Sequence, residues 1–350
     1  YAVLSSTHRE LALARATAEQ AGIPIRWCAE RSVIPALHHI REIRGLLQQL
    51  HERRSSVARP SAVRVKVSDL PRFNPLNPWF QFILATLDAW EAESGDAELP
   101  VQDTIEFMFE SCAESRSNLT FGQGVTFATV HAAKGTEFDH VLLIGAWPMN
   151  AKAAKQEELR RVFYVGMTRA RRSLAIFDRA DVRPSIPAGL SGEPFLRRPA
   201  DAPKEIAAPV VTGYETLALE DIHLGYPAQF PARHPVHSAL AALEPGSVLH
   251  VRREGRGIGL FDHNGLCVAR LSRKAEMEWG NRLAAIRCAR VVAMVARTVD
   301  QDTELDRREA CQVSEWEVPL VELVLGGATA DTRSSGRRAV KDCPCPSEAV

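Results

Sequence analysis

The sequence has no excess of charge of either sign, because Lys and Arg total 43 and Asp and Glu also total 43. This balance excludes a uniformly basic nucleic-acid coat and an acidic solvating tail, although it allows a local basic face. The chain also lacks the run of roughly 18 apolar residues that a transmembrane helix needs, so we expect no membrane partner. It begins with Tyr1, and no charged segment leads into an apolar signal core. We therefore expect a fragment whose N-terminal part is missing.

Cysteine is scarce and follows no recognisable pattern. The seven cysteines are odd in number, and their spacings match neither a disulfide framework nor a zinc site. Cys343 and Cys345 are close together, but no second pair would complete a metal site. We therefore expect reduced thiols, no metal ligands in this chain, and a cytoplasmic protein.

A phosphate-binding loop is absent as well. The sequence contains no G-x-x-x-x-G-K-[ST] motif and no Gly-Lys dipeptide. It also has no Asp-Glu pair after a buried strand, which is where such sites hold Mg²⁺. The chain by itself therefore predicts no complete nucleotide site.

The apolar pattern predicts an α/β domain built in two parts, residues 1–33 and 119–182. In the first part, a strand over 2–5, a helix over 10–21 and a strand over 25–28 suggest a parallel unit. In the second part, strand character returns three times around one helical segment: the strands are 125–131, 140–145 and 173–178, and the helix is 155–168. We expect a parallel sheet with helices on its faces.

The remaining segments predict an insertion and a second domain. Residues 34–118 are helical in pattern and punctuated by prolines, which indicates a small helical insertion. Residues 183–245 are rich in Pro and Gly and suggest a linker or connector. Short strands around the turn Asp262-His263-Asn264-Gly265 predict a small β-rich domain over 246–325. The tail, 326–350, is expected to be disordered.

Two polar stretches carry the chemistry of the α/β domain. The first is the loop from Thr129 to Asp139, which follows a predicted strand, and ligands bind where parallel strands end. The second is an arginine-rich stretch at a helix end, residues 157–172. Basic side chains outnumber acidic ones over 152–172, which suits contact with DNA phosphates, although a solvated helix face would look the same.

These stretches resemble motifs V and VI of superfamily 1 DNA helicases of the UvrD/Rep/PcrA group. Motif V is matched by Thr129, His131, Ala133, Lys134, Gly135, Glu137 and Phe138. Motif VI is matched by Glu157, Glu158, Arg160, Arg161, Tyr164, Val165, Thr168, Arg169 and Ala170. The resemblance covers residues 1–200 well and the rest weakly.

The resemblance implies that ATP binds between two RecA-like motor domains and that this chain supplies the second. Arg169 would be the arginine finger that reaches the γ-phosphate, since a fixed guanidinium stabilises the charge that spreads during phosphoryl transfer. The alternative for Arg169 is a structural salt bridge. Glu137 and Gly135 would lie at the nucleotide, with a loop-capping role as the alternative for Glu137.

The resemblance also implies contacts with single-stranded and duplex DNA. Thr129 and His131 match residues that touch the DNA backbone, although a histidine after a strand is more often a core residue. Lys134 would contact phosphate or solvate the loop. Tyr164 and Thr168 are further predicted DNA contacts.

The first strand departs from the family pattern. It resembles motif IV, but the expected aromatic falls on Ser5 and the expected arginine on Ser6, so ATP turnover could be slowed. Motifs I to III, the Mg²⁺ ligands and the N-terminal motor domain would lie upstream of Tyr1.

We therefore expect the C-terminal part of an ATP-dependent DNA helicase, inactive on its own. The alternative is a non-catalytic nucleic-acid or partner-binding module with a degenerate helicase fold. In the β-rich domain, residues 252–256 could bind nucleic acid or belong to a plain structural cap. Trp279 and Trp316 could stack on bases, but core packing is the expectation.

Overall fold

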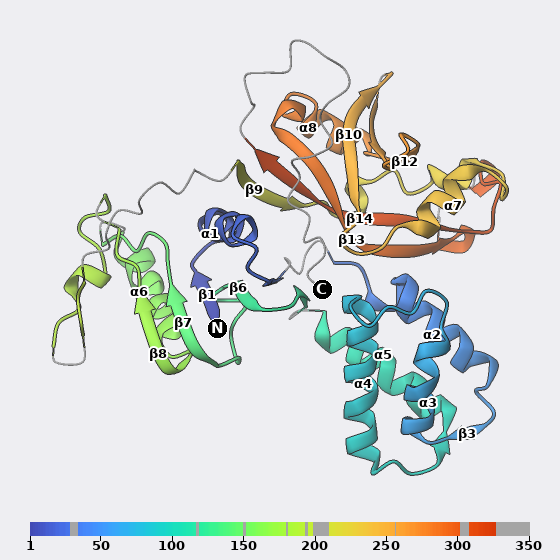
Figure 1. The fold of residues 1–350 in the computed structure, drawn as a ribbon, viewed down its shortest axis with the longest axis horizontal. Coiled ribbons are helices and arrows are strands. Elements are labelled where there is room, and N and C mark those ends of the chain that lie inside the picture. The colour runs from blue at the N-terminus through green and yellow to red at the C-terminus, as the bar shows by residue number, and fades with distance from the viewer. Residues whose placement is uncertain are drawn as a thin grey trace. The chain divides into compact units, whose positions relative to one another are not determined.

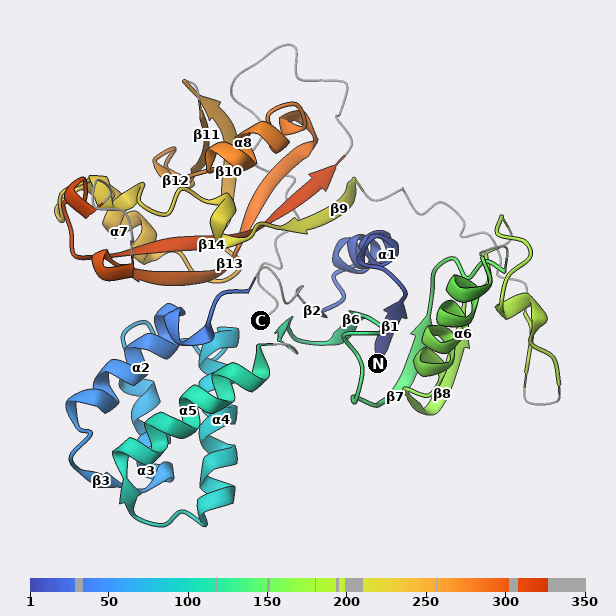
Figure 2. The ribbon, with the colours of Figure 1, turned by 180° about the vertical axis from the view of Figure 1, so that it is seen from behind.

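A computed structural model of the chain describes residues 1–28, 34–116, 119–149, 152–179, 181–192, 195–198, 210–255, 257–301 and 308–326. They form two compact units, and each unit combines segments that are distant in sequence (Figures 1 and 2). The first unit contains the described parts of 1–28 and 120–213, and the second those of 29–119 and 214–328. No helix among the described residues is long and apolar enough to cross a membrane.

The first unit is built on a six-stranded sheet with the order β5-β2-β6-β1-β7-β8. The central strand β1 pairs in parallel with β6 and β7, β2 is parallel to β6, and β8 is parallel to β7. Only β5, at one edge, runs antiparallel to its neighbour. This arrangement confirms the predicted α/β fold. The strands are β1 (Ala2–Ser5), β2 (Ile25–Cys28), β5 (Thr120–Gly122), β6 (Val125–Thr129), β7 (Phe138–Leu143) and β8 (Ala170–Ile176).

Helices cover both faces of this sheet because side chains alternate along each strand. Val3 of β1 and Phe127 of β6 pack with Leu11 of helix α1 (His8–Gln20). The next residues along both strands, Leu4 and Ala128, belong to a different core with Phe163 of helix α6 (Ala153–Met167). The sheet is therefore wound on both faces, as in nucleotide-binding folds.

The second unit has two parts, which we call the arm and the body. The arm, residues 34–116, is the predicted helical insertion. The helical pattern predicted from residue 34 becomes a regular helix only at Arg41, because residues 37–39 form a separate 3-10 turn and Ile40 is extended. The arm's elements are η2 (Leu37–His39), α2 (Arg41–Glu52), β3 (Val57–Ala58), α3 (Pro60–Lys66), η3 (Val67–Asp69), α4 (Pro78–Ser94), β4 (Leu99–Pro100) and α5 (Val101–Ser115).

The body, residues 214–326, includes the segment 246–325 that the sequence predicts to be β-rich and extends it towards the N-terminus. Its sheet has the order β12-β11-β10-β13-β14-β9, and β10 to β14 pair antiparallel to their neighbours. The predicted turn is present, with the Asp262 carboxylate accepting the N–H groups of Asn264 and Leu266. The body's elements are β9 (Val211–Thr216), α7 (Pro235–Ala242), β10 (Val248–Glu254), β11 (Gly257–Phe261), β12 (Cys267–Arg270), α8 (Arg273–Trp279), β13 (Ile286–Thr298) and β14 (Glu315–Gly326).

The body has an apolar core of its own. Trp279 and Trp316 are almost fully buried in it, so they pack in the core as expected and offer no exposed stacking platform. The buried residues of this core cluster all come from the body, from Leu217 to Leu323. The predicted disordered tail lies outside the described residues beyond Gly326, as do Cys343 and Cys345.

The predicted connector over 183–245 is wrong for most of its described length. Ile186 and Leu190 pack against the core of the first unit, and Ile222 and Val236 are buried in the body. The prolines that suggested a linker instead begin short helical segments, where a missing N–H costs nothing. These segments are η4 (Pro187–Gly189), η6 (Pro227–Gln229) and α7.

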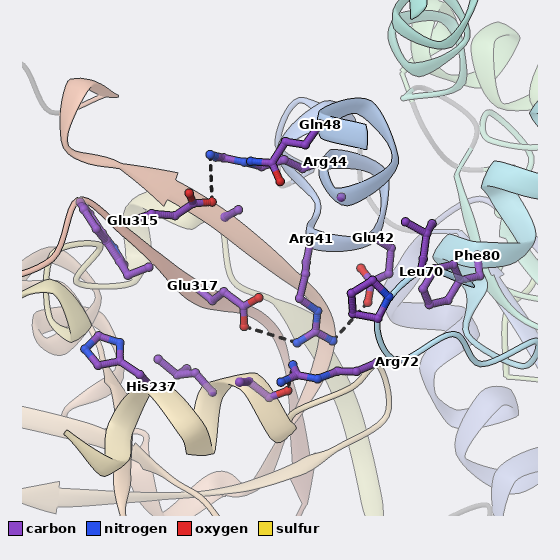
Figure 3. Close-up of a pocket in the computed structure, with 16 residues that line it drawn as sticks. Arg41, Glu42, Arg44, Gln48, Leu70, Arg72, Phe80, His237, Glu315 and Glu317 are labelled. Carbon is purple, nitrogen blue, oxygen red and sulfur yellow. Dashed lines mark hydrogen bonds and ion pairs between the residues drawn. The ribbon is translucent and has the colours of Figure 1, made fainter. Parts of the chain in front are cut away.

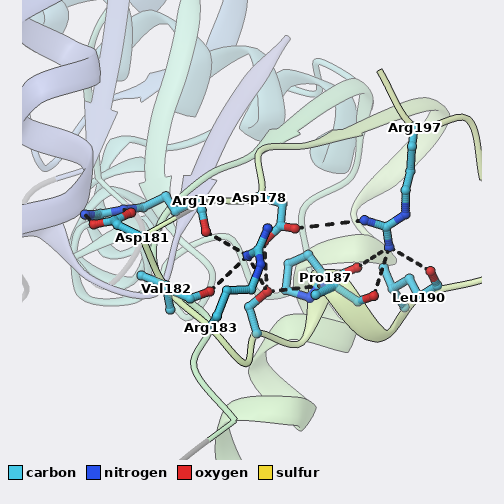
Figure 4. A network of polar contacts seen from close by, with 10 residues as sticks. Asp178, Arg179, Asp181, Val182, Arg183, Pro187, Leu190 and Arg197 are labelled. Carbon is cyan, nitrogen blue, oxygen red and sulfur yellow. Dashed lines mark hydrogen bonds and ion pairs between the residues drawn. The ribbon is translucent and has the colours of Figure 1, made fainter. Parts of the chain in front are cut away.

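The segment after β8 is fixed by a polar network (Figure 4). Asp178 accepts hydrogen bonds from Ser185 Oγ at 2.9 Å and from Arg183 Nη1 at 3.0 Å. Arg197 Nη2 donates to the carbonyls of Pro187 and Leu190. These contacts join the described residues of 178–197 to one another, and backbone hydrogen bonds from Met149 to Pro184 and from Ile186 to Trp147 tie them to the rest of the unit.

Candidate functional site

The parallel strands separate the predicted site residues onto two edges of the sheet. Thr129 ends β6 and lies at the carboxyl edge, beside Ser5 of β1. Glu137 precedes β7 and Arg169 precedes β8, so both lie at the amino edge. The Phe138 N–H donates to the Arg169 carbonyl at 2.8 Å, which ties the two strand starts together. The motif V loop therefore runs from one edge to the other.

At the carboxyl edge, Thr129 supports the loop that follows it. Its side chain is buried, and its Oγ1 accepts a hydrogen bond from the Ala132 N–H at 3.2 Å. His131 and Lys134 are exposed, so His131 is not the core residue that its position alone would favour. Their contact with DNA remains a prediction.

At the amino edge, Arg169 is partly buried and its guanidinium is held by neutral oxygens. Nε donates to the Val165 carbonyl at 3.1 Å, and Nη2 donates to Thr168 Oγ1 at 3.1 Å. Nη1 reaches the Thr136 carbonyl at 3.5 Å. Within the described part of the chain no carboxylate pairs with Arg169, so the structure does not place it in the salt bridge considered as the alternative.

Glu137 lies at the same edge and is engaged by another arginine. Arg171 Nε donates to Glu137 Oε2 at 2.9 Å, and both side chains are about half exposed. Arg172 lies 3.8 Å from Asp139. Acids at the start of β7 therefore neutralise part of the basic stretch, while the charge of Arg169 is not neutralised in this way.

The remaining predicted residues frame the same edge. Gly135 has a left-handed backbone with φ of +83°, and nothing would meet a Cβ added to it. Tyr164 is 63% exposed near the end of α6, and Thr168 follows α6 with its Oγ1 donating to the Val165 carbonyl. Thr168 therefore serves to position Arg169. Contact of these residues with a nucleotide or with DNA remains a prediction.

Sequence reasoning missed Glu10, which lies at the carboxyl edge in the first turn of α1. Its Oε2 accepts hydrogen bonds from Ser5 Oγ at 2.6 Å and Ser6 Oγ at 2.9 Å. Its Oε1 accepts the Ala146 N–H at 2.6 Å. The two serines that replace the expected aromatic and arginine therefore hold a carboxylate.

Gly145 makes this approach possible. Its φ is +110°, and a Cβ added there would lie 2.6 Å from Ser5 Oγ and 2.7 Å from Glu10 Oε2. The signal for Glu10 was present in the sequence, because Thr7 and Glu10 have the Thr-x-x-Glu spacing of a capping box. Thr7 does cap α1 by accepting the Glu10 N–H at 3.3 Å.

Possible metal ligands and cysteine thiols are further candidate parts of a site in the described residues. Among the described residues, no group of three or more His, Cys, Asp or Glu side chains could hold a metal ion. Cys112 and Cys267 are buried cysteines that form no disulfide. Burial raises the pKa of the Cys112 thiol to about 12, so this cysteine is unreactive at neutral pH.

In the body, the arginines of the predicted basic hairpin contact other residues of the body. The Arg252 guanidinium lies over the Phe261 ring at 3.8 Å, and Arg253 Nη2 reaches the Gly280 carbonyl at 3.3 Å. These contacts suit the structural-cap alternative. Binding of nucleic acid by this edge remains a prediction.

Comparisons with known proteins point to one family. Residues 81–178 match the UvrD-like helicase C-terminal domain. The ATP-dependent DNA helicase UvrD2 of Mycobacterium tuberculosis (strain H37Rv) is 45% identical over 64 residues, which are 15% of this chain and 9% of that protein. A probable DNA helicase II homolog of Rickettsia conorii is 43% identical over 85 residues, 22% of this chain and 13% of that protein. The matches thus span a small part of each of these curated relatives.

Proposed function

We propose that the chain is the C-terminal part of an ATP-dependent DNA helicase, because residues 81–178 match the UvrD-like helicase C-terminal domain. It would couple ATP hydrolysis to movement on single-stranded DNA and to duplex unwinding. The α/β unit would be the second RecA-like motor domain. ATP and Mg²⁺ would bind where this unit meets an N-terminal motor domain, which would supply the phosphate-binding loop and the Mg²⁺ ligands.

The observation that carries this proposal is the state of Arg169. Its guanidinium is oriented by Val165, Thr168 and Thr136, which are neutral acceptors, so its positive charge is fixed in place without being cancelled. Phosphoryl transfer is accelerated by this kind of preorganised charge, because stabilising the transition state then requires no reorganisation. Glu137 and Gly135 lie beside it on the same edge and would contact the nucleotide.

DNA contact would use exposed side chains of the motif V loop and of the end of α6. His131, Lys134 and Tyr164 are all exposed, and exposed basic and aromatic side chains suit phosphate contact and base stacking on a single strand. Thr129 is buried, so we propose that it acts on DNA by positioning the loop and not by direct contact.

The test replaces Arg169 with Ala in the full-length protein. DNA-stimulated ATPase activity should fall by about 10³-fold or more, the effect of losing an arginine finger, while single-stranded DNA binding is retained. Arg26→Ala is the matched control, because Arg26 is an exposed arginine of the same sheet whose Nε also reaches a carbonyl, that of Gly122. Normal turnover by the Arg169 variant would refute the arginine-finger role.

A second candidate is a non-catalytic nucleic-acid or partner-binding module. The Glu10 carboxylate favours it, because an acid at the carboxyl end of β1 repels phosphate where the fold family expects an arginine. The upstream sequence discriminates the two: a phosphate-binding loop and an Asp-Glu motif there support the helicase, and their absence supports the module. Purified residues 1–350 should hydrolyse no ATP in either case, and measurable hydrolysis would contradict a site shared between two domains.

A further inference from the structure

The arm and the body of the second unit meet along a seam made by residues far apart in sequence. The Trp79 indole N–H donates to the Val292 carbonyl at 3.1 Å, and both groups are buried. Ile40 forms an isolated antiparallel bridge with Val295, and both side chains are fully buried. Part of the seam is therefore apolar and closely packed.

The rest of the seam is charged and centres on Arg41 (Figure 3). Arg41 Nη2 donates to the Leu243 carbonyl of the body at 2.9 Å, and Nη1 lies 3.4 Å from Glu317 Oε2 of β14. Nη2 also lies 3.2 Å from Glu42 Oε1, in the arm itself. Only 15% of the Arg41 side chain is exposed, so one guanidinium joins the arm to two elements of the body with little water around it.

In two further contacts near Arg41, the arm again supplies the positively charged side chain. Arg44 Nη2 pairs with Glu315 Oε1 at 2.9 Å, and Arg72 Nη1 donates to the Ala241 carbonyl. In these contacts the arm supplies the cations and the body supplies the carboxylates and carbonyls. Contacts of opposite charge select one orientation of two surfaces, because like charges would meet in others.

The charged part of the seam is incompletely satisfied. A cavity of about 430 Å³ lies there, lined by side chains of both the arm and the body, among them Arg41, Arg72, Phe80, His237 and Trp316. Glu42 is buried, and its Oε2 has no hydrogen-bond partner among the described residues, although Asn77 Nδ2 and Arg41 reach its Oε1. Burial raises the pKa of Glu317. Water would relieve these buried charges if the seam opened.

The body does not need the arm to complete its core. The buried residues of the body's core cluster all lie between Leu217 and Leu323. Along β13, Val291 and Met294 point into that core, whereas Val295 meets the arm. Separation of the arm would expose one side of β13 and leave this core intact.

We propose that the seam is an ionic latch, which opens as a local unit and releases the arm from the body without unfolding either, and that Arg41 holds it closed. The closed state rests on the apolar contacts around Ile40 and Trp79 and on a few charge contacts beside a cavity, and the charge contacts weaken when one partner is lost or when salt screens the outer pairs. The inference rests on the seam alone and is independent of the proposed helicase function.

The test is amide hydrogen exchange on the whole chain. In Arg41→Met, exchange at residues 37–48 and 292–296 should accelerate by about tenfold or more. The amides of Val321 and Leu323 in β14, whose side chains lie in the body core and which pair with Val291 and Ala289, should stay as protected as in the wild type. Arg64→Met is the matched control, because Arg64 pairs with Asp88 and Glu91 inside the arm and is half exposed. It should leave the seam unchanged.

Two further variants keep the proposal falsifiable if Arg41→Met fails to fold. Glu315→Gln removes only the outer pair with Arg44 and should accelerate amide exchange at the seam by about threefold. Added salt should accelerate exchange at the seam of the wild type to a similar extent, because it screens the same exposed pair. A disulfide between Ile40→Cys and Val295→Cys, which face each other across a β-bridge, should abolish these accelerations when oxidised. Unchanged seam exchange in the folded variants, or equal acceleration across arm and body, would overturn the latch.

Discussion

Two sets of charged groups, one in each unit of the chain, are held in different ways. In the α/β unit, Arg169 and Glu10 are each held by neutral groups of the same unit, carbonyls and hydroxyls in one case and hydroxyls and an amide in the other. In the second unit, Arg41 and Glu317 pair with each other across the seam, and Arg41 also donates to the neutral Leu243 carbonyl. Neutral partners fix the position of a charged group without cancelling its charge, so the charge can still act on a ligand. Partners of opposite charge cancel it, and the contact is then lost when either partner is removed.

Within the α/β unit, substitutions at two glycines should give the largest effects, and they compare the packing around Glu10 with that of the motif V loop. Gly145→Ala should lower the free energy of unfolding by about 3 kcal/mol, because its Cβ would meet Ser5 Oγ and Glu10 Oε2 and its backbone is left-handed. Gly135→Ala is left-handed too but meets nothing, so it should cost only about 1 kcal/mol. Urea unfolding measures both, and equal losses would show that the carboxyl edge is not packed around Glu10.

The carboxylate itself gives the next largest effect. Glu10→Ala leaves the fully buried Ser5 hydroxyl and the Ala146 N–H without their acceptor, which should cost about 2 kcal/mol of unfolding free energy. Glu137→Ala at the amino edge removes an exposed pair with Arg171 and should change stability by less than about 0.5 kcal/mol. A Glu10 variant as stable as the Glu137 variant would mean that the serine cluster does not depend on the charge.

Sequence reasoning reached the parts of this molecule that local patterns specify. The strand around Leu4, the Asp262 turn and the arginine-rich end of α6 each have a signature within a few residues, and the structure has all three elements. The edge on which each site residue lies follows from strand direction, which a parallel sheet fixes once its order is known.

The seam had no such signature. Ile40 and Val295 form a β-bridge although they are far apart in the sequence. Neither local sequence predicts which segment it will pair with. Arg41 and Glu42 look like an ordinary helix start, since acids favour the first turn. The proline-rich stretch misled for a related reason, because proline marks the start of a helical turn as well as a linker, and only the buried apolar residues between the prolines distinguish the two.

The pH dependence of the seam gives the smallest effect and tests the contrast between neutral and charged partners. Burial raises the pKa of Glu317 above its ordinary value, so the folded chain binds this proton more tightly than the unfolded chain. The stability linked to that proton is complete below the ordinary pKa and is lost as pH rises through the raised one. Relative to Glu317→Gln, the wild type should therefore lose stability between pH 4 and pH 7, by under about 1 kcal/mol for a pair that keeps some water contact. Thermal unfolding of both proteins at the two pH values measures this difference. The opposite sign would mean that the attraction of Arg41 outweighs the effect of burial on the pKa of Glu317.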